Sequence, residues 1–213
     1  MTGGVHVWAN CRVERQLGRA GYRFIAGLDE AGRGSWAGPL VAAAVILPGL
    51  EIQRAWWLRG VADSKLLSPE TRERLAKIIL RRALSVGVGV VAPESIDLLG
   101  LTAAGHLCFW RALRNLGIAP DYLLIDAFRI PDARVPQRGI IGGDRKCVSI
   151  AAASIVAKVA RDRMMRGLAL QYPDYGLDGH KGYGTPEHQR LLIDVGPSSI
   201  HRHSWAPVSA LVI

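Results

Sequence analysis

Three short apolar runs in this chain each end in an acidic residue, and this pattern restricts the fold more than any other feature of the sequence. The run at 24–28 is followed by Asp29, and the run at 122–125 by Asp126. The run at 139–141 is followed by two glycines and then Asp144. Short runs rich in aliphatic side chains are typical of strands. We therefore predict three strands that deliver their carboxylates to one edge of a sheet.

The segments between these runs complete an α/β pattern. Two further strands are expected at 39–47 and 85–91, and helices are expected at 68–84, 96–116, 185–193 and from 149 onward. Ser68 followed by Pro69 is a typical helix start, because a serine hydroxyl caps free amide groups and proline suits the first helical position. Together these elements predict a mixed central sheet flanked by helices.

Apolar spacing supports two of these helices and predicts the faces of the second. In 96–116, Leu107, Trp110, Leu113 and Leu116 recur at threefold spacing. In the helix from Ser149, the inward side chains should be Ile150, Ala153, Ala157, Ala160 and Met164, with Ser154, Lys158, Arg161 and Asp162 on the opposite side. Lys158 and Arg161 could then face either solvent or a substrate.

Length and composition favour one globular domain. A chain of 213 residues that is 49% hydrophobic can bury a full core. We expect a polar, solvated lead-in at 1–21, then a single domain at 22–213 that includes a helical and turn-rich C-terminal appendage from about residue 171. We also expect a monomer.

Charge, cysteine content and hydropathy indicate the kind of binding partner and the cellular compartment. The 27 basic and 18 acidic residues give a formal charge of +9, which favours a polyanionic partner such as nucleic acid, although it could merely aid solubility. Three scattered cysteines predict neither a disulfide framework nor a zinc site. The longest apolar run, 40–47, is much shorter than the ~20 residues of a membrane span, and no signal peptide is evident. We therefore expect a cytoplasmic protein.

The acids Asp29, Glu30, Asp126 and Asp144 together predict a metal site. Each alone is compatible with a structural role such as capping a turn, but several like charges are costly to bury unless cations neutralise them. Mg²⁺ and Mn²⁺ prefer such oxygen ligands, and two ions can stabilise the attacking and leaving oxygens of a phosphoryl displacement. Because successive strand side chains point to opposite faces, Asp29 and Glu30 can share a site only if the strand ends or bends, and Ala31-Gly32 supplies that break.

Two glycine-framed segments suggest contacts with a ligand. The stretch GRGSWA at 32–37 matches a dinucleotide-binding fingerprint, but that fingerprint opens a helix, whereas a strand-like run follows here. Tyr183 lies between glycines, so its ring could stack on a sugar or base, or simply pack in a tight turn. His180, His201 and His203 show no zinc-site spacing.

Six motifs in a fixed order carry a family resemblance. They are DEAGRG at 29–34, GPLVAAAVIL at 38–47, DSKLLS at 63–68, LLIDAF at 123–128, GGDRKCVSIAAASIVAKVARDR at 142–163 and HKGYGTPEH at 180–188. In this combination, over about residues 22–208, the sequence closely resembles bacterial ribonuclease HII, the type 2 ribonuclease H. The resemblance implies a ribonuclease H-like fold.

The resemblance also implies an activity and a set of roles. The enzyme would cut the RNA strand of RNA/DNA hybrids and incise 5′ of single ribonucleotides in duplex DNA, leaving 3′-hydroxyl and 5′-phosphate ends. By motif position, the metal-binding catalytic acids would be Asp29, Glu30, Asp126 and Asp144. The ribose 2′-hydroxyl would be contacted by Gly32, Arg33 and Gly34, and the sugar would pack on Tyr183. A phosphate would be bound by Ser64 and Lys65. Ala127-Phe128 stands where relatives often have a glycine, which should alter local packing.

Two alternatives belong to different classes. One is a non-catalytic nucleic-acid-binding module with the same fold, which loss of the acids would support, and all four acids are present. The other is the related ribonuclease HIII type, which usually has an extra N-terminal substrate-binding domain, for which we expect 1–21 to be too short.

Overall fold

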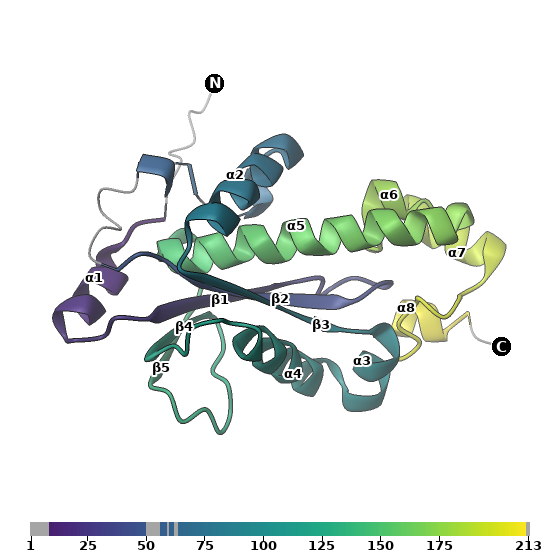
Figure 1. Cartoon of the computed structure of the whole chain (residues 1–213). Coiled ribbons are helices and arrows are strands. Elements are labelled where there is room, and N and C mark those ends of the chain that lie inside the picture. The colour runs from purple at the N-terminus through teal and green to yellow at the C-terminus, as the bar shows by residue number, and fades with distance from the viewer. Residues whose placement is uncertain (1–8, 50–55, 59, 62–63, 212–213) are drawn as a thin grey trace.

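Five strands form one mixed sheet in the computed structural model, which describes residues 9–49, 56–58, 60–61 and 64–211 (Figure 1). The strands are β1 (Ile25–Ala31), β2 (Leu40–Ile46), β3 (Ser85–Val91), β4 (Tyr122–Asp126) and β5 (Gln137–Ile140), in the spatial order β3-β2-β1-β4-β5. β1, β2 and β3 pair antiparallel, whereas β4 lies parallel to β1 and β5 parallel to β4. The predicted mixed sheet is confirmed.

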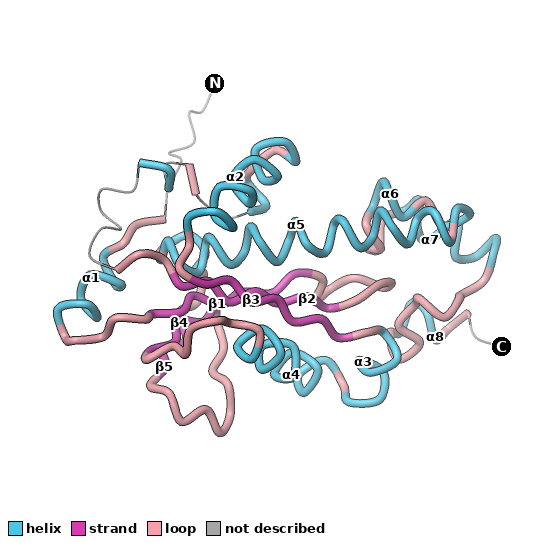
Figure 2. The backbone as a smooth tube through the Cα atoms, viewed as in Figure 1, coloured by secondary structure: helices cyan, strands magenta, loops and turns pink. Residues whose placement is uncertain are grey.

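Helices cover both faces of this sheet (Figure 2). They are α1 (Arg12–Arg19), α2 (Pro69–Arg82), α3 (Pro93–Leu99), α4 (Leu101–Arg114), α5 (Val148–Gln171), α6 (Leu177–His180), α7 (Pro186–Val195) and α8 (Ala206–Ser209). α5 and α2 lie on one face, and α3 and α4 on the other. Ser68 caps α2 as predicted, because its hydroxyl accepts the Thr71 amide at 3.2 Å. None of the helices in the described part of the chain is both long and apolar enough to cross a membrane.

Strand β2 shows how the two layers share the core. Ala42 and Ala44 pack toward α4, whereas Ala43 and Val45 pack toward α5 and α2. Because both faces are covered, every residue of β2 is buried, and the strand reads as one apolar run.

The helix predicted at 96–116 is instead two helices. Of the four side chains at threefold spacing, Leu107, Leu113 and Leu116 are partly buried against the core. Gly100, with φ 76°, separates α3 from α4. In α4 the buried residues include Cys108 and Ala112, whereas Trp110 is 38% exposed. The reason lies in β3, where a Cβ on Gly87 would come within 2.1 Å of the Ala112 carbonyl oxygen. α4 lies so close to the sheet that small side chains must face it.

The inward face predicted for the long helix is correct only near its start. Ala153 and Ala157 are buried in α5, but Met164 is 36% exposed and Arg161, expected on the polar side, is fully buried. The first half of α5 is buried nearly all round, so spacing alone could not identify its sides.

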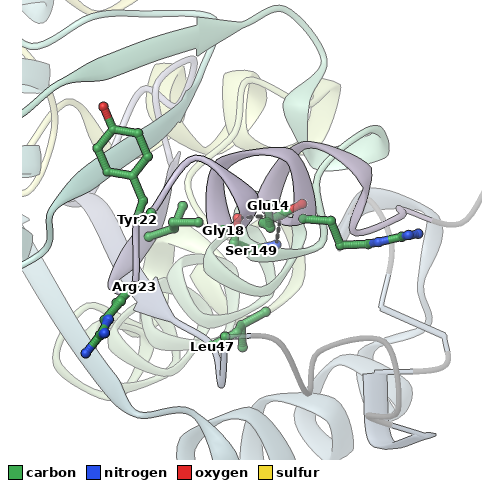
Figure 3. A pocket seen from close by; sticks show the side chains of 10 residues that line it. Glu14, Gly18, Tyr22, Arg23, Leu47 and Ser149 are labelled. Carbon is green, nitrogen blue, oxygen red and sulfur yellow. Dashed lines mark hydrogen bonds between the residues drawn. The ribbon is translucent and has the colours of Figure 1, made fainter.

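The lead-in is less solvated than predicted. Glu14 in α1 is only 6% exposed, and its Oε1 accepts hydrogen bonds from the Ser149 amide and hydroxyl at 3.0 and 2.7 Å (Figure 3). Burial raises the pKa of Glu14. This contact ties α1 to the first turn of α5, beside a cavity of about 530 Å³ that Tyr22 and Leu47 also line. Residues 1–8 of the predicted lead-in lie outside the described residues.

Candidate active site

Asp29 and Glu30 lie near the end of β1 and point to opposite faces of the sheet. Asp29 is paired with Ala43, which belongs to the α5 side of the core, and Glu30 with Ala42, which belongs to the α4 side. β1 does not stop at Asp29 but continues to Ala31. The predicted break at Ala31-Gly32 is therefore correct, and both carboxylates reach the same strand end.

Asp126 is the neighbour of Asp29 across the sheet. The parallel pairing of β1 with β4 ends at Leu28 opposite Ile125, so the two aspartates follow directly, on adjacent strands and on the same face. Asp126 Oδ1 accepts the Gly143 amide at 2.7 Å, which ties it to the 3₁₀ turn Gly143–Arg145. Asp144 lies in that turn and is 5% exposed.

A cleft of about 240 Å³ opens at this strand end. It is lined by Asp29, Glu30, Ala31, Gly32, Arg33, Gly34, Ser64, Lys65, Asp126, Ser154, Lys158 and Tyr183. The structure thus brings together every predicted site residue except Asp144, which is buried in the adjoining turn. Asp63, the first residue of the DSKLLS motif, lies outside the described residues.

The carboxylates in this cleft are electrostatically unfavourable as they stand. Burial, then the charges of Glu30 and Asp126, raise the pKa of Asp29 well above its usual value. Burial raises the pKa of Glu30 to about 7, although the nearby Arg33 guanidinium opposes this. Glu30 Oε2 is buried and has no hydrogen-bond partner within the described chain. A set of crowded carboxylates with an unsatisfied buried oxygen fits hard divalent cations.

The side chains are not arranged as a finished metal cage. Over the described residues, no group of three or more His, Cys, Asp or Glu side chains is placed to hold an ion. The donor chemistry fits a divalent ion, and the acids would have to draw together around it.

Ser154 connects the first acid to the DSKLLS motif and was not predicted to do so. Its hydroxyl hydrogen-bonds to Asp29, which lowers the pKa of that acid, and lies 2.9 Å from the Ser64 hydroxyl. Both serines are buried. The hydroxyls therefore form a chain that supports Asp29 from α5, and spacing along α5 gave no signal for this role.

The two glycines of the Gly32–Gly34 loop differ in what they require. Gly32 has φ 93°, and a Cβ there would lie 2.1 Å from Arg161 Nε. Gly34 is exposed and has no positive φ, and a Cβ there would meet no atom within 4 Å. Packing inside the protein thus explains Gly32 but not Gly34, whose open surface allows a ligand to approach the backbone.

The Arg33 side chain lines the cleft and contacts two side chains outside the loop. Its guanidinium lies 3.7 Å from Glu30 Oε1 and 4.6 Å from the centroid of the Phe128 ring. Phe128 follows Ala127, whose φ of 57° is unusual for a residue with a Cβ. The altered packing expected at Ala127-Phe128 is thus a contact of Phe128 with Arg33.

Three histidines form a buried stack beneath Tyr183. The rings of His180 and His188 lie 4.2 Å apart, and His188 Nε2 lies 3.2 Å from His201 Nε2. His188 Nδ1 is 3.0 Å from the Tyr183 carbonyl oxygen, which assigns it as the donor there and His201 as the donor to His188. Burial lowers the pKa of His188 and His201 to about 4. Hydrogen bonds and ring contacts thus tie the three histidines together as a structural unit.

Comparison with known proteins now identifies the family. The family model of ribonuclease HII matches residues 26–208. The chain is 48% identical over 200 residues to ribonuclease HII of Chloroflexus aggregans, covering 94% of each protein. This chain belongs to the ribonuclease HII family. It is therefore a nuclease of the ribonuclease H type, as the motifs predicted.

Solved structures agree with this fold. The ribonuclease H2 of Pyrococcus horikoshii OT3 superimposes with a TM-score of 0.76 at 29% identity, covering 88% of this chain and 96% of that one. The ribonuclease HII of Archaeoglobus fulgidus, solved in complex with PCNA, gives a TM-score of 0.70 at 30% identity, covering 85% and 95%. The ribonuclease H-like fold is confirmed, and the GRGSWA stretch leads into strand β2 and not into a helix.

Proposed function

We propose that this enzyme uses divalent metal ions, Mg²⁺ or Mn²⁺, to cut the RNA strand of RNA/DNA hybrids and to incise 5′ of single ribonucleotides in duplex DNA. The products would carry 3′-hydroxyl and 5′-phosphate ends. The observation that carries the proposal is the convergence of Asp29, Glu30 and Asp126 in one cleft beside the open backbone of Gly34. The acids supply the chemistry, and the open loop supplies the place where a ribose is read.

The carboxylates would hold the ions, with Asp144 joining from the neighbouring turn. Bound ions would neutralise these acids and stabilise the negative charge that develops on the phosphate during hydrolysis. Asp29 is kept in place by Ser154, and Asp126 by the Gly143 amide. Neither serine nor any other side chain in the cleft needs to act as a nucleophile.

The residues of the cleft other than the acids would bind the nucleic acid. Lys65 and Lys158 supply positive charge next to the acids, and phosphates favour such contacts. Tyr183 is half-buried, with Lys158 Nζ 5.3 Å from its ring centroid, and offers a flat surface for a sugar. Gly34 would let the backbone approach the 2′-hydroxyl, the group that separates RNA from DNA.

The direct test is incubation with duplex DNA that contains one ribonucleotide, in Mg²⁺, in Mn²⁺ or in chelator. We expect incision 5′ of the ribonucleotide with metal, no incision with chelator, and no cutting of the matched all-DNA duplex. Mapping the ends of both fragments checks the predicted 3′-hydroxyl and 5′-phosphate. Absence of incision with both metals would reject the proposal.

A further inference from the structure

We propose that Arg161 and Arg202, two buried arginines far apart in sequence, are positioning residues that fix the Gly32–Gly34 loop for recognition of the ribose. This proposal rests on the function proposed above. We call the two residues the arginine clamp. Neither was predicted as a site residue, and both are fully buried.

Arg161 reaches the loop from α5. Its guanidinium donates hydrogen bonds to the carbonyl oxygens of Pro39, Ala37 and Lys181 at 2.9, 3.0 and 3.0 Å, and to the Ser35 hydroxyl at 2.8 Å. One side chain thus holds the residues after the loop and the segment that leads to the tyrosine of the cleft. The two walls of the cleft cannot shift independently while these bonds persist.

Arg202 reaches the loop from the C-terminal appendage. It donates to the carbonyl oxygens of Gly32 at 2.6 Å, Arg33 at 3.0 Å and Gly38 at 3.1 Å. These carbonyls are therefore turned toward the protein interior. Within the described residues, the amides of Arg33 and Gly34 donate no hydrogen bond to the backbone. The clamp thus orients the loop so that its amides remain for a ligand.

The clamp is electrostatically unusual. Among the described residues, neither guanidinium takes part in an ion pair with a carboxylate. A buried charge without a counter-ion is costly, and here backbone carbonyls and one hydroxyl compensate it. If only a filled interior were required, an apolar side chain would suffice, so the fold uses these guanidiniums to specify backbone geometry.

The clamp also determines which residues the loop can contain. Arg161 Nε occupies the space where a side chain at Gly32 would lie, and its guanidinium carbon lies 5.1 Å from the ring centroid of Tyr183. The same side chain therefore contacts both elements proposed to touch the sugar. A change in its length should disturb ribose recognition before it disturbs the carboxylates.

The test compares binding of two duplexes by Arg161→Lys and Arg202→Lys. One duplex contains a single ribonucleotide and the other is all DNA, and Ca²⁺ replaces Mg²⁺ so that neither is cut during the measurement. Lysine keeps the charge but cannot make the forked hydrogen bonds. The Kd ratio is the Kd for the all-DNA duplex divided by the Kd for the ribonucleotide duplex. We expect this ratio to fall by about tenfold in each variant, equivalent to about one lost hydrogen bond. The Kd for the all-DNA duplex itself should change little.

The ratio separates positioning from simple loss of folded protein, because a reduced active fraction affects both duplexes equally. Arg163→Lys is the matched control, since Arg163 lies on the same helix but is exposed and bound to Glu73. Ser35→Ala, which removes one acceptor of Arg161, gives a milder second variant if the lysine variants do not fold, with an expected loss of about threefold.

An unchanged Kd ratio in variants that fold would overturn the clamp proposal, provided that wild-type enzyme prefers the ribonucleotide duplex and cuts it in Mg²⁺. If wild-type enzyme shows neither preference nor cutting, the proposed function itself fails. The two failures are therefore distinguishable.

Discussion

Asp29-Glu30 and the Gly32–Gly34 loop are neighbours in the sequence, but the fold treats them in opposite ways. Asp29 is buried and Glu30 partly buried beside Asp126, the pKa values of both are raised, and Glu30 Oε2 has no hydrogen-bond partner among the described residues. In the loop, by contrast, the carbonyls of Gly32 and Arg33 are satisfied by Arg202.

The acids and the loop therefore differ in whether their polar groups are satisfied within the protein. The acids keep crowded negative charge and one unsatisfied oxygen, which under the proposed function bound cations would compensate. The carbonyl groups of the loop are already hydrogen-bonded to Arg202 inside the protein, so the shape of the loop is fixed before any substrate binds. Substitutions of the acids should therefore lower activity without destabilising the fold, whereas substitutions in the loop should lower stability where the packing is tight and activity where the backbone is open.

The largest effect is expected from Asp126→Asn. Removing one carboxylate charge should lower the cleavage rate at least about 10³-fold, because metal binding depends on clustered negative charge. Asparagine can still accept the Gly143 amide, so the fold and binding of RNA/DNA hybrid should persist. Single-turnover cleavage with and without Mg²⁺ measures this. Asp121→Asn, at the opposite end of β4, is the control, and Mg²⁺-dependent turnover in Asp126→Asn would contradict the assignment.

The loop side is tested by the pair Gly32→Ala and Gly34→Ala. A Cβ at Gly32 would collide with Arg161 at a positive φ, so we expect the free energy of unfolding to fall by about 2 to 4 kcal/mol. A Cβ at Gly34 meets nothing, so stability should change by less than about 0.5 kcal/mol.

Activity distinguishes the same pair in the opposite direction. Gly34→Ala should fold normally but cleave about tenfold more slowly, because its methyl group would lie where the ribose approaches. Chemical denaturation and single-turnover cleavage on one preparation provide both values. Full activity in Gly34→Ala would show that the substrate does not approach the backbone there.

The histidine stack near Tyr183 should make the stability of the fold decrease at acidic pH. His188 and His201 have folded-state pKa values of about 4, below the ordinary value of 6.5. Below pH 6.5 the unfolded chain therefore binds protons that the folded protein binds only near pH 4. This contribution to stability is full above pH 6.5 and is lost as pH falls, by about 2 to 3 kcal/mol for each histidine by pH 4.5.

The acids Asp29 and Glu30 act in the reverse sense, because their raised pKa values favour the folded protein at low pH. The measurement is therefore the difference between wild-type protein and His188→Gln in chelator, from pH 7 to pH 4.5. We expect a smaller acid-induced loss of stability in the variant. Parallel curves for the two proteins would exclude a role for the stack.

A small gain in stability is expected from Asp29→Asn in the absence of metal, whereas its loss of activity should resemble that of Asp126→Asn. Asn can keep the hydrogen bond from the Glu30 amide, while one of the crowded buried charges disappears. We expect the free energy of unfolding in chelator at pH 8 to rise by about 1 to 2 kcal/mol, with activity lost. Thermal unfolding of both proteins in chelator measures this, and a destabilised variant would show that the acids are compensated after all.

Local patterns in the sequence predicted most of the sheet and most of the cleft. Apolar runs identified the strands, the acids after them identified Asp29 and Asp126 as neighbours, and the motifs identified the family. The predictions that failed concerned one helix boundary, the faces of α5 and the burial of the lead-in. In α4 the glycines of the preceding strand β3 require small side chains against the sheet, and nothing within the helix sequence reports that close approach.

The sequence by itself determined the family and the residues proposed for the chemistry, because carboxylates after strands, a basic charge and glycine-framed loops can be read without knowledge of the fold. Only the tertiary structure decided how the loop is held. Arg161 contacts Ser35 across 126 residues, and Arg202 contacts Gly32 across 170. A buried arginine and a surface arginine look alike in sequence, since the difference lies in which carbonyls the folded chain brings to them.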